Sequence, residues 1–171
     1  VDGFEMGDYL LTIPANLIGE PTTVLFRKEY LDEPFGTFSG RRYICNVDLA
    51  SWLNLLAKGR IVYIAQTLSY FRFHDGQQQQ SKKMSIGGMN DFAHQIIRSP
   101  GKGFFQGDAQ YVKAIDNCLR YMDGLYNLFD WTDDDEQSAE YRQSLVYYQM
   151  LKQKRAEIDP RFELNEQPLV S

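Results

Sequence analysis

A chain of 171 residues that is 43% hydrophobic and 14% aromatic can fill a core, which argues against disorder. Its net charge of -5 offers no basic surface for nucleic acid, and none of its apolar stretches approaches the roughly 20 residues of a membrane-spanning helix. We see no export signal, and the two distant cysteines, Cys45 and Cys118, fit neither a disulfide framework nor a metal cluster. We therefore expect reduced thiols in a cytoplasmic protein with no membrane span.

The pattern of the chain changes near residue 85. We expect residues 1–85 to hold short strands and one clear helix, and residues 86–158 to form a helical extension. Residues 159–171 contain two prolines and little periodicity, which indicates a loosely ordered tail. The expected fold class is α+β: a small mixed sheet with one flanking helix, followed by a helical C-terminal region.

In the first region, a strand is predicted at Thr22–Arg27, which is rich in β-branched and aromatic residues and follows a Gly-Glu-Pro turn. Leu31–Arg42 contains a proline and two glycines and is predicted to be a loop. A helix follows, because Asn46 is a good N-cap and Gly59 stands where a left-handed C-terminal cap belongs. Its apolar face consists of Leu49, Trp52, Leu53, Leu55 and Leu56.

Two further strands are predicted at Ile61–Ala65 and Leu68–His74. Side chains two residues apart share a face of a strand, so Arg72 and His74 point to the same side, opposite the two phenylalanines of that strand. The phenylalanines suit the buried face. Arg72 and His74 are therefore expected to face a cleft or solvent.

The second region reads as three helices, Asn90–Arg98, Asp108–Leu128 and Gln137–Ile158. Thr132, with Asp135 three residues later, forms an approximate capping box for the last of them, with Asp in place of the usual Glu.

Asp48 and His74 are candidates for chemistry, and each also has a structural interpretation. Asp48 lies in the first turn of its helix, where the helix dipole stabilises any carboxylate by about 0.3–1 kcal/mol. His74 ends a strand and could be a metal ligand, a general acid or base, or an inert surface residue. Taken singly, both positions fit the structural interpretation better. His94 lies inside a helix among apolar neighbours and is predicted to pack.

Two other patterns are explained better by structure than by a ligand. The Asp-x-Asp of Asp133–Asp135 lies at a helix start, where the dipole stabilises acids. Pro100–Gly103 has glycines around a lysine but lacks the spacing of a phosphate-binding loop, so we expect a flexible loop there.

The order of the first-region features is more specific than any one of them. The features are Gly19-Glu20-Pro21-Thr22, Val24-Leu25-Phe26-Arg27, Asp48, Trp52-Leu53, Leu55-Leu56, Gly59–Ile64, Leu68–His74 and Ser81. This succession resembles the C-terminal, acceptor-side half of family 2 glycosyltransferases of the GT-A type. In that family a strand ending in Phe-Arg precedes a helix opened by Asp and carrying Trp-Leu, and a strand pair closes on Tyr-x-Arg-x-His. The resemblance covers residues 16–81.

The resemblance implies roles for three residues. Asp48 takes the place of the family's catalytic base, and His74 that of the histidine near the metal and the diphosphate, with Arg72 beside it. Val47 stands where the family usually has Glu, which is a departure from the motif. A divalent cation, Mg²⁺ or Mn²⁺, is expected for the intact enzyme, and this chain alone is expected to hold none tightly.

The resemblance also implies a partial GT-A α/β fold, since no segment before residue 16 is long enough to supply the family's nucleotide-binding strands. The expected function is inverting transfer of a sugar from a nucleotide-sugar donor to a hydroxyl of a glycan or protein, in bacterial-type cell-surface polysaccharide or glycan synthesis. Without the N-terminal domain, we expect the chain to be inactive. Two alternatives stay open: a non-catalytic carbohydrate-binding or protein-interaction module on a transferase-like scaffold, and a degenerate transferase.

Overall fold

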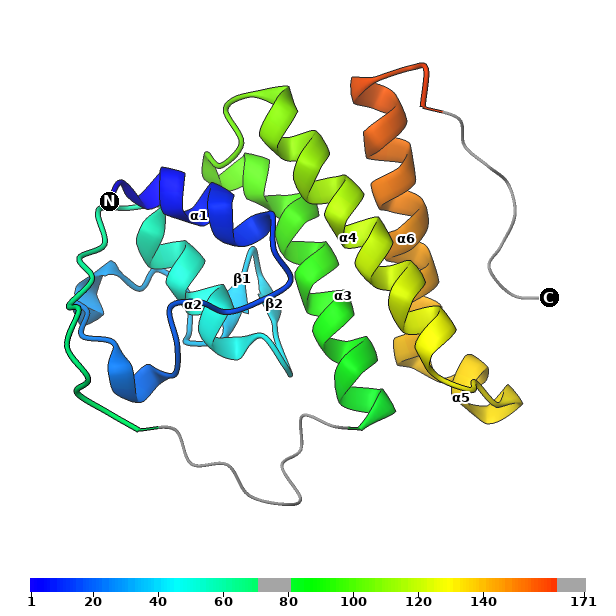
Figure 1. The fold of residues 1–171 in the computed structure, drawn as a ribbon, viewed down its shortest axis with the longest axis horizontal. Coiled ribbons are helices and arrows are strands. Elements are labelled where there is room, and N and C mark those ends of the chain that lie inside the picture. Colours follow the sequence, from blue (N-terminus) through cyan, green and yellow to red (C-terminus); the bar gives the residue numbers. More distant parts are fainter. Residues whose placement is uncertain (71–80, 163–171) are drawn as a thin grey trace.

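The computed structural model describes residues 1–70 and 81–162. Its α-helices are α1 (Gly3–Leu11), α2 (Val47–Leu56), α3 (Lys82–Arg98), α4 (Asp108–Leu128), α5 (Asp133–Gln137) and α6 (Ala139–Ile158). Short 3-10 helices are η1 (Pro21–Thr23), η2 (Lys28–Tyr30) and η4 (Ser99–Lys102), and β1 (Thr37–Phe38) pairs antiparallel with β2 (Arg41–Arg42). Figure 1 shows α3, α4 and α6 side by side, with α1, α2 and the strand pair gathered beside α3.

Helices with a small antiparallel sheet agree with the predicted α+β class, but the predicted strands are wrong. Thr22–Arg27 begins inside η1 and then runs extended, with Leu25 fully exposed, and Ile61–Ala65 contains no strand. Leu68–Tyr70 is not a strand either, and the rest of that prediction lies outside the described residues. A β-branched run is a strand only when a neighbouring strand takes its backbone hydrogen bonds, and no such neighbour lies in the described part of the chain.

The strands lie instead in the segment that was predicted to be a loop. Phe38 pairs with Arg41 across a two-residue turn, Ser39-Gly40, in which both residues have positive φ angles of 50° and 78°. Such a turn matches the twist of a two-stranded hairpin. The Glu33 carboxylate accepts the Ser39 and Gly40 amides at 3.0 and 2.8 Å, which holds the turn from outside.

Helix α2 confirms the predicted helix and the N-cap position of Asn46, whereas the C-terminal cap predicted at Gly59 is wrong. Asn46 occupies the N-cap position, but its side chain donates to the Gly88 carbonyl of α3 at 2.9 Å instead of capping the first turn. At the other end the helix closes at Ala57 in ordinary helical geometry, and Gly59 does not have a positive φ. Polar side chains of α2 bind the neighbouring loop: Ser51 Oγ accepts the Gly36 amide, and Asn54 donates to the Thr37 carbonyl, both at 2.8 Å.

The helices of the second region were predicted more closely. Helix α4 has the predicted bounds, and α3 begins at Lys82 rather than Asn90 because Ser81 caps it by accepting the Met84 amide. The capping box of Thr132 is confirmed, but it opens the short α5. Helix α6 begins after a separate N-cap, Ser138. Helix α1, capped by the side chain of Asp2, was not predicted.

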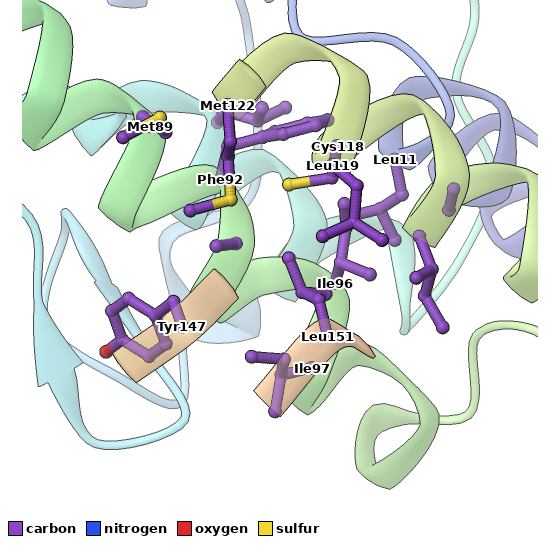
Figure 2. Packing of buried hydrophobic residues seen from close by; sticks show 14 of the residues in the cluster. Leu11, Met89, Phe92, Ile96, Ile97, Cys118, Leu119, Met122, Tyr147 and Leu151 are labelled. Carbon is purple, nitrogen blue, oxygen red and sulfur yellow. The ribbon is translucent and has the colours of Figure 1, made fainter. Parts of the chain in front are cut away.

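One hydrophobic core joins residues from both regions of the chain. In Figure 2, side chains of α3 and α4 point toward one another, and Leu11 of α1 and Leu151 of α6 close the same cluster. Phe38 and Leu53 from the hairpin and α2 belong to it as well. The proposed division of the chain near residue 85 stays a prediction. Within residues 1–70 and 81–162, no helix combines the length and apolarity that a membrane crossing requires.

Candidate functional site

Asp48 lies in the first turn of α2, where it is partly buried. Trp52 follows four residues later, so both side chains lie on the same face of the helix. The Trp52 ring is 1% exposed, and its indole N–H donates to the Gly19 carbonyl at 3.0 Å. This hydrogen bond ties the segment around residue 19 to the face of α2 that carries Asp48.

The segment before η1 has a fixed local geometry. Asn16 Oδ1 accepts the Ile18 and Gly19 amides at 3.1 and 3.2 Å, and Gly19 has a φ of 103°, which only glycine adopts without strain. Farther along the chain, Phe26 and Phe35 pack edge-on against the Trp52 ring, with centroids 5.7 and 5.6 Å away. Gly19, Phe26 and Phe35 thus all contact Trp52 of α2.

Glu20, next to Gly19, lies beside Asp48. Burial raises the pKa of Asp48 above its ordinary value, and the charge of the Glu20 carboxylate and a hydrogen bond between the two carboxyl groups raise it further. Because like charges this close disfavour double ionisation, the pair can hold a proton more readily than an isolated aspartate. In the sequence, Glu20 stands in the Gly-Glu-Pro turn with no predicted role, because nothing local relates it to a residue of α2.

The start of α2 is fixed by a buried aspartate that sequence reasoning also missed. Asp91 of α3 is 1% exposed, and its Oδ2 accepts the backbone amides of Ile44, Cys45 and Asn46 at 3.2, 2.9 and 3.1 Å. Its Oδ1 accepts from Arg41 at 2.9 Å. Burial raises the pKa of Asp91, while the three amides and Arg41 act against that rise. The residues that lead into α2 thus meet a single carboxylate.

His94 packs in the core, as predicted. It is 6% exposed, and its Nδ1 lies 2.6 Å from the Tyr43 hydroxyl. Burial raises the pKa of Tyr43 far above its ordinary value, so the phenol keeps its proton, and the imidazole tautomer decides which of the two groups donates in this hydrogen bond. Burial, with the nearby Arg41 and Arg98 charges, lowers the pKa of His94 to about 4. A neutral, hydrogen-bonded imidazole in this position serves packing.

The other predicted site residues, Arg72 and His74, lie outside the described residues. Their proximity to Asp48 therefore stays a prediction. Among residues 1–70 and 81–162, no three His, Cys, Asp or Glu side chains are grouped so that they could hold a metal ion. The divalent cation expected for the intact enzyme therefore stays a prediction.

The Asp-x-Asp of residues 133–135 and the Pro-Gly-Lys-Gly segment both have structural roles. Asp135 accepts from the Thr132 amide, the Thr132 hydroxyl and Lys82, as expected for a helix start. Lys102 of the Pro-Gly-Lys-Gly segment pairs with Glu33 at 2.5 Å, and most of that segment forms η4 rather than a flexible loop. The carboxylate that holds the hairpin turn therefore also binds this lysine. Cys45 and Cys118 are both free, and burial raises their pKa values.

Two hollows lie on the described surface near α1 and α2, and Asp48 lines neither of them. A hollow of about 90 Å³ adjoins the start of α2, lined in part by Asn16, Asn46 and Tyr121. This is well below the roughly 300–1,000 Å³ of ordinary ligand sites. A larger hollow of about 370 Å³ lies between α1 and α4, lined in part by Asp8 and Lys113, and does not include Asp48.

Comparison with known proteins does not assign the chain to a family. No family model matches the chain, and neither a curated protein nor a solved structure matches it.

Proposed function

We propose that this chain is the acceptor-side part of an inverting glycosyltransferase of the GT-A type, in which Asp48 is the catalytic base. The observation that carries the proposal is the state of Asp48: a partly buried carboxylate at a helix start whose pKa is raised by burial and by Glu20. An aspartate that served only as a first-turn acid would be stabilised in its charged form, with a lowered pKa. A raised pKa brings the group closer to the range in which general bases work best.

In the proposed reaction, the Asp48 carboxylate takes the proton of the acceptor hydroxyl while that oxygen attacks the anomeric carbon of the donor. The new bond is between the acceptor oxygen and the anomeric carbon. The bond that breaks joins the anomeric carbon to the diphosphate oxygen, and its electron pair leaves with the nucleotide diphosphate. Arg72 and His74 are proposed to face that diphosphate, where positive charge stabilises the leaving group. The divalent cation of the intact enzyme would supply further positive charge there, with His74 as a ligand.

Exposed apolar side chains outside the helices and strands support a contact with a further domain in the intact enzyme. Leu25 is 100% exposed, Val62 85% and Tyr63 86%, and all three lie on chain that has no ladder partner among the described residues. Apolar surface of this kind marks a contact site. We propose that the nucleotide-binding half of a GT-A fold covers it, that the chain alone does not transfer sugar, and that the enzyme works in the cytoplasm in glycan synthesis.

The test is an assay of the proposed intact enzyme, with the nucleotide-binding half present, for sugar-nucleotide hydrolysis and transfer in the presence of Mg²⁺ or Mn²⁺. Asp48→Asn removes the base and leaves the shape of the side chain, so kcat is expected to fall by about 10²–10⁴-fold. Asp108→Asn is the matched control, because Asp108 is also a first-turn acid but is exposed at the start of α4. Equal rates for the two variants would remove Asp48 from the role of base.

The exposed side chains of Leu25, Val62 and Tyr63 also favour the alternative function, a protein-interaction module with a transferase-like scaffold. The same assay separates the two, because an interaction module needs no base. If Asp48→Asn and Asp108→Asn behave alike, and substitution of Val62 and Tyr63 by Ser abolishes association with the nucleotide-binding half, the interaction role is the better description.

A further inference from the structure

We propose that Asp91 of α3 is a positioning residue for Asp48: its carboxylate fixes the backbone that leads into α2 and so holds Asp48 against Glu20. The inference rests on the proposed function for its catalytic meaning. Asp91 lies in the helical region, for which the sequence offered no function, and that region thereby gains a role in the site.

The geometry at Asp91 is that of a carboxylate bound by consecutive amides. Ile44, Cys45 and Asn46 donate to one oxygen, and Asp48 is two residues farther along the chain. Three backbone N–H groups converging on one anion fix the orientation of three successive peptide units. The side chain of Asn46 adds a fourth link to α3 through the Gly88 carbonyl. The first turn of α2 therefore starts from a backbone with little freedom.

Of the two glycines of α3 that lie against Cys45, Gly87 makes the tight contact and Gly88 an ordinary one. A Cβ on Gly87 would lie 2.9 Å from Cys45 Sγ, and one on Gly88 would lie 3.6 Å from Cys45 Cβ. A larger side chain at Gly87 would displace the Cys45 thiol, which also contacts the Met84 carbonyl. Glycine there lets the Ile44–Asn46 amides reach a carboxylate that belongs to the same helix.

Arg41 links Asp91 to α6. Its guanidinium donates to Asp91 Oδ1 at 2.9 Å and to the Tyr147 hydroxyl and the Asn90 carbonyl at 3.2 Å each. The Asp91 charge is thus neutralised by a partner that is itself held by α3 and α6. A buried carboxylate with this set of partners stabilises one arrangement of the segments around it, and removal of one partner leaves the others unsatisfied.

The titration of Asp48 reports its position. Its pKa is raised only while burial and Glu20 act on it, so displacement of the first turn of α2 would return it toward the ordinary value of 3.8. The experiment is therefore a ¹³C NMR titration of the Asp48 carboxyl, with amide ¹H shifts of residues 44–46 as a second signal. It uses the chain alone and requires no turnover.

In Asp91→Asn, a neutral amide replaces the carboxylate that accepts hydrogen bonds from four donors. The NH₂ end of this amide is itself a donor, and it would face either Arg41 or the backbone amides. We expect the amide signals of residues 44–46 to move upfield and the Asp48 pKa to fall toward 3.8. Leu151→Ala is the matched control, because it removes a fully buried core side chain of α6 and lowers stability without touching Asp91. The Asp48 pKa should be unchanged in this control.

Arg41→Gln is the second variant and keeps the test usable if Asp91→Asn does not fold. It leaves the three amides on the carboxylate but removes the charged partner of Asp91 Oδ1 and its link to Tyr147, so a smaller fall in the Asp48 pKa is expected. If the Asp48 pKa keeps its wild-type value in every folded variant of Asp91 and Arg41, the positioning role is overturned. If positioning holds but Asp48→Asn does not slow the intact enzyme, the proposed function fails and the structural inference stands.

Discussion

The burial of His94 makes stability depend on pH. In the folded protein the pKa of His94 is about 4, whereas an exposed histidine has a value of 6.5, so the unfolded chain binds a proton first as the pH falls. This contribution to stability is complete above pH 6.5 and is lost as the pH falls toward 4. Its size is on the order of 1–3 kcal/mol. Urea unfolding of the wild type at pH 7 and pH 4.5 measures it.

His94→Gln isolates the contribution, because glutamine does not titrate. Asp8, Asp48 and Asp91 have raised pKa values and contribute pH dependence of the opposite sign in the acid range, so the wild-type curve alone is insufficient. The informative quantity is the free energy of unfolding of the wild type minus that of His94→Gln. We expect this difference to shrink as the pH falls. A difference that is the same at pH 7 and pH 4.5 would contradict the assignment.

At the scale of single residues, the sequence allowed prediction wherever the partner is local. Asp48 in a first turn and the Thr132–Asp135 capping box depend on residues within one helical turn, and both are confirmed. Glu20 and Asp91 act on residues that are far away in the chain, and no periodicity relates them to their partners. Two acids in unremarkable local contexts therefore became visible only in the folded structure.

At the scale of elements, helices were predicted better than strands because helical hydrogen bonds are internal to the segment. Helix α4 has the predicted bounds, whereas the strand predicted at Thr22–Arg27 depended on a sheet neighbour that the sequence does not specify. The real hairpin depends on a Ser-Gly turn with two positive φ angles and on the Glu33 carboxylate outside it. The single-helix prediction for Gln137–Ile158 missed the break at Ser138, where a new N-cap begins α6.

Two helical glycines should respond in opposite ways to alanine. A Cβ on Gly3 would collide with the carbonyl oxygens of Leu56 and Gly59, because α1 starts directly against the end of α2. Gly3→Ala is expected to lower the free energy of unfolding by about 1–3 kcal/mol. Gly124 lies on an exposed face of α4, and a Cβ there meets nothing within 4 Å. Gly124→Ala should raise stability by about 0.5–1 kcal/mol.

Chemical denaturation at pH 7, followed by circular dichroism, measures both changes under the same conditions. Gly124→Ala is the control for Gly3→Ala, since both substitutions add one methyl group to a helix. Stabilisation by both alanines would show that α1 is free to move away from the end of α2, contrary to the close packing described here.

At the scale of the whole molecule, the core does not follow the change of pattern near residue 85. Its members come from α1, the hairpin and α2 as well as from α3, α4 and α6, and Arg41 links β2 to α3 and α6 through polar contacts. The change of pattern in the sequence reflects local composition, whereas burial depends on which helix and hairpin faces pack against one another in the folded chain. A chain with this core is expected to unfold in one cooperative transition.

Leu151→Ala tests that expectation, because Leu151 of α6 is fully buried and belongs to the second region. The substitution should lower the free energy of unfolding by about 2–5 kcal/mol. In a Trp131→Phe background, fluorescence reports Trp52 of α2, and far-UV circular dichroism reports helices throughout the chain. With one core, both signals should show the same lowered midpoint in urea, so a cavity in α6 would destabilise the helix that carries Asp48. A fluorescence midpoint that stays at its Trp131→Phe value while the dichroism midpoint falls would instead mean that the two regions fold separately, and that α3 and α6 do not secure the site.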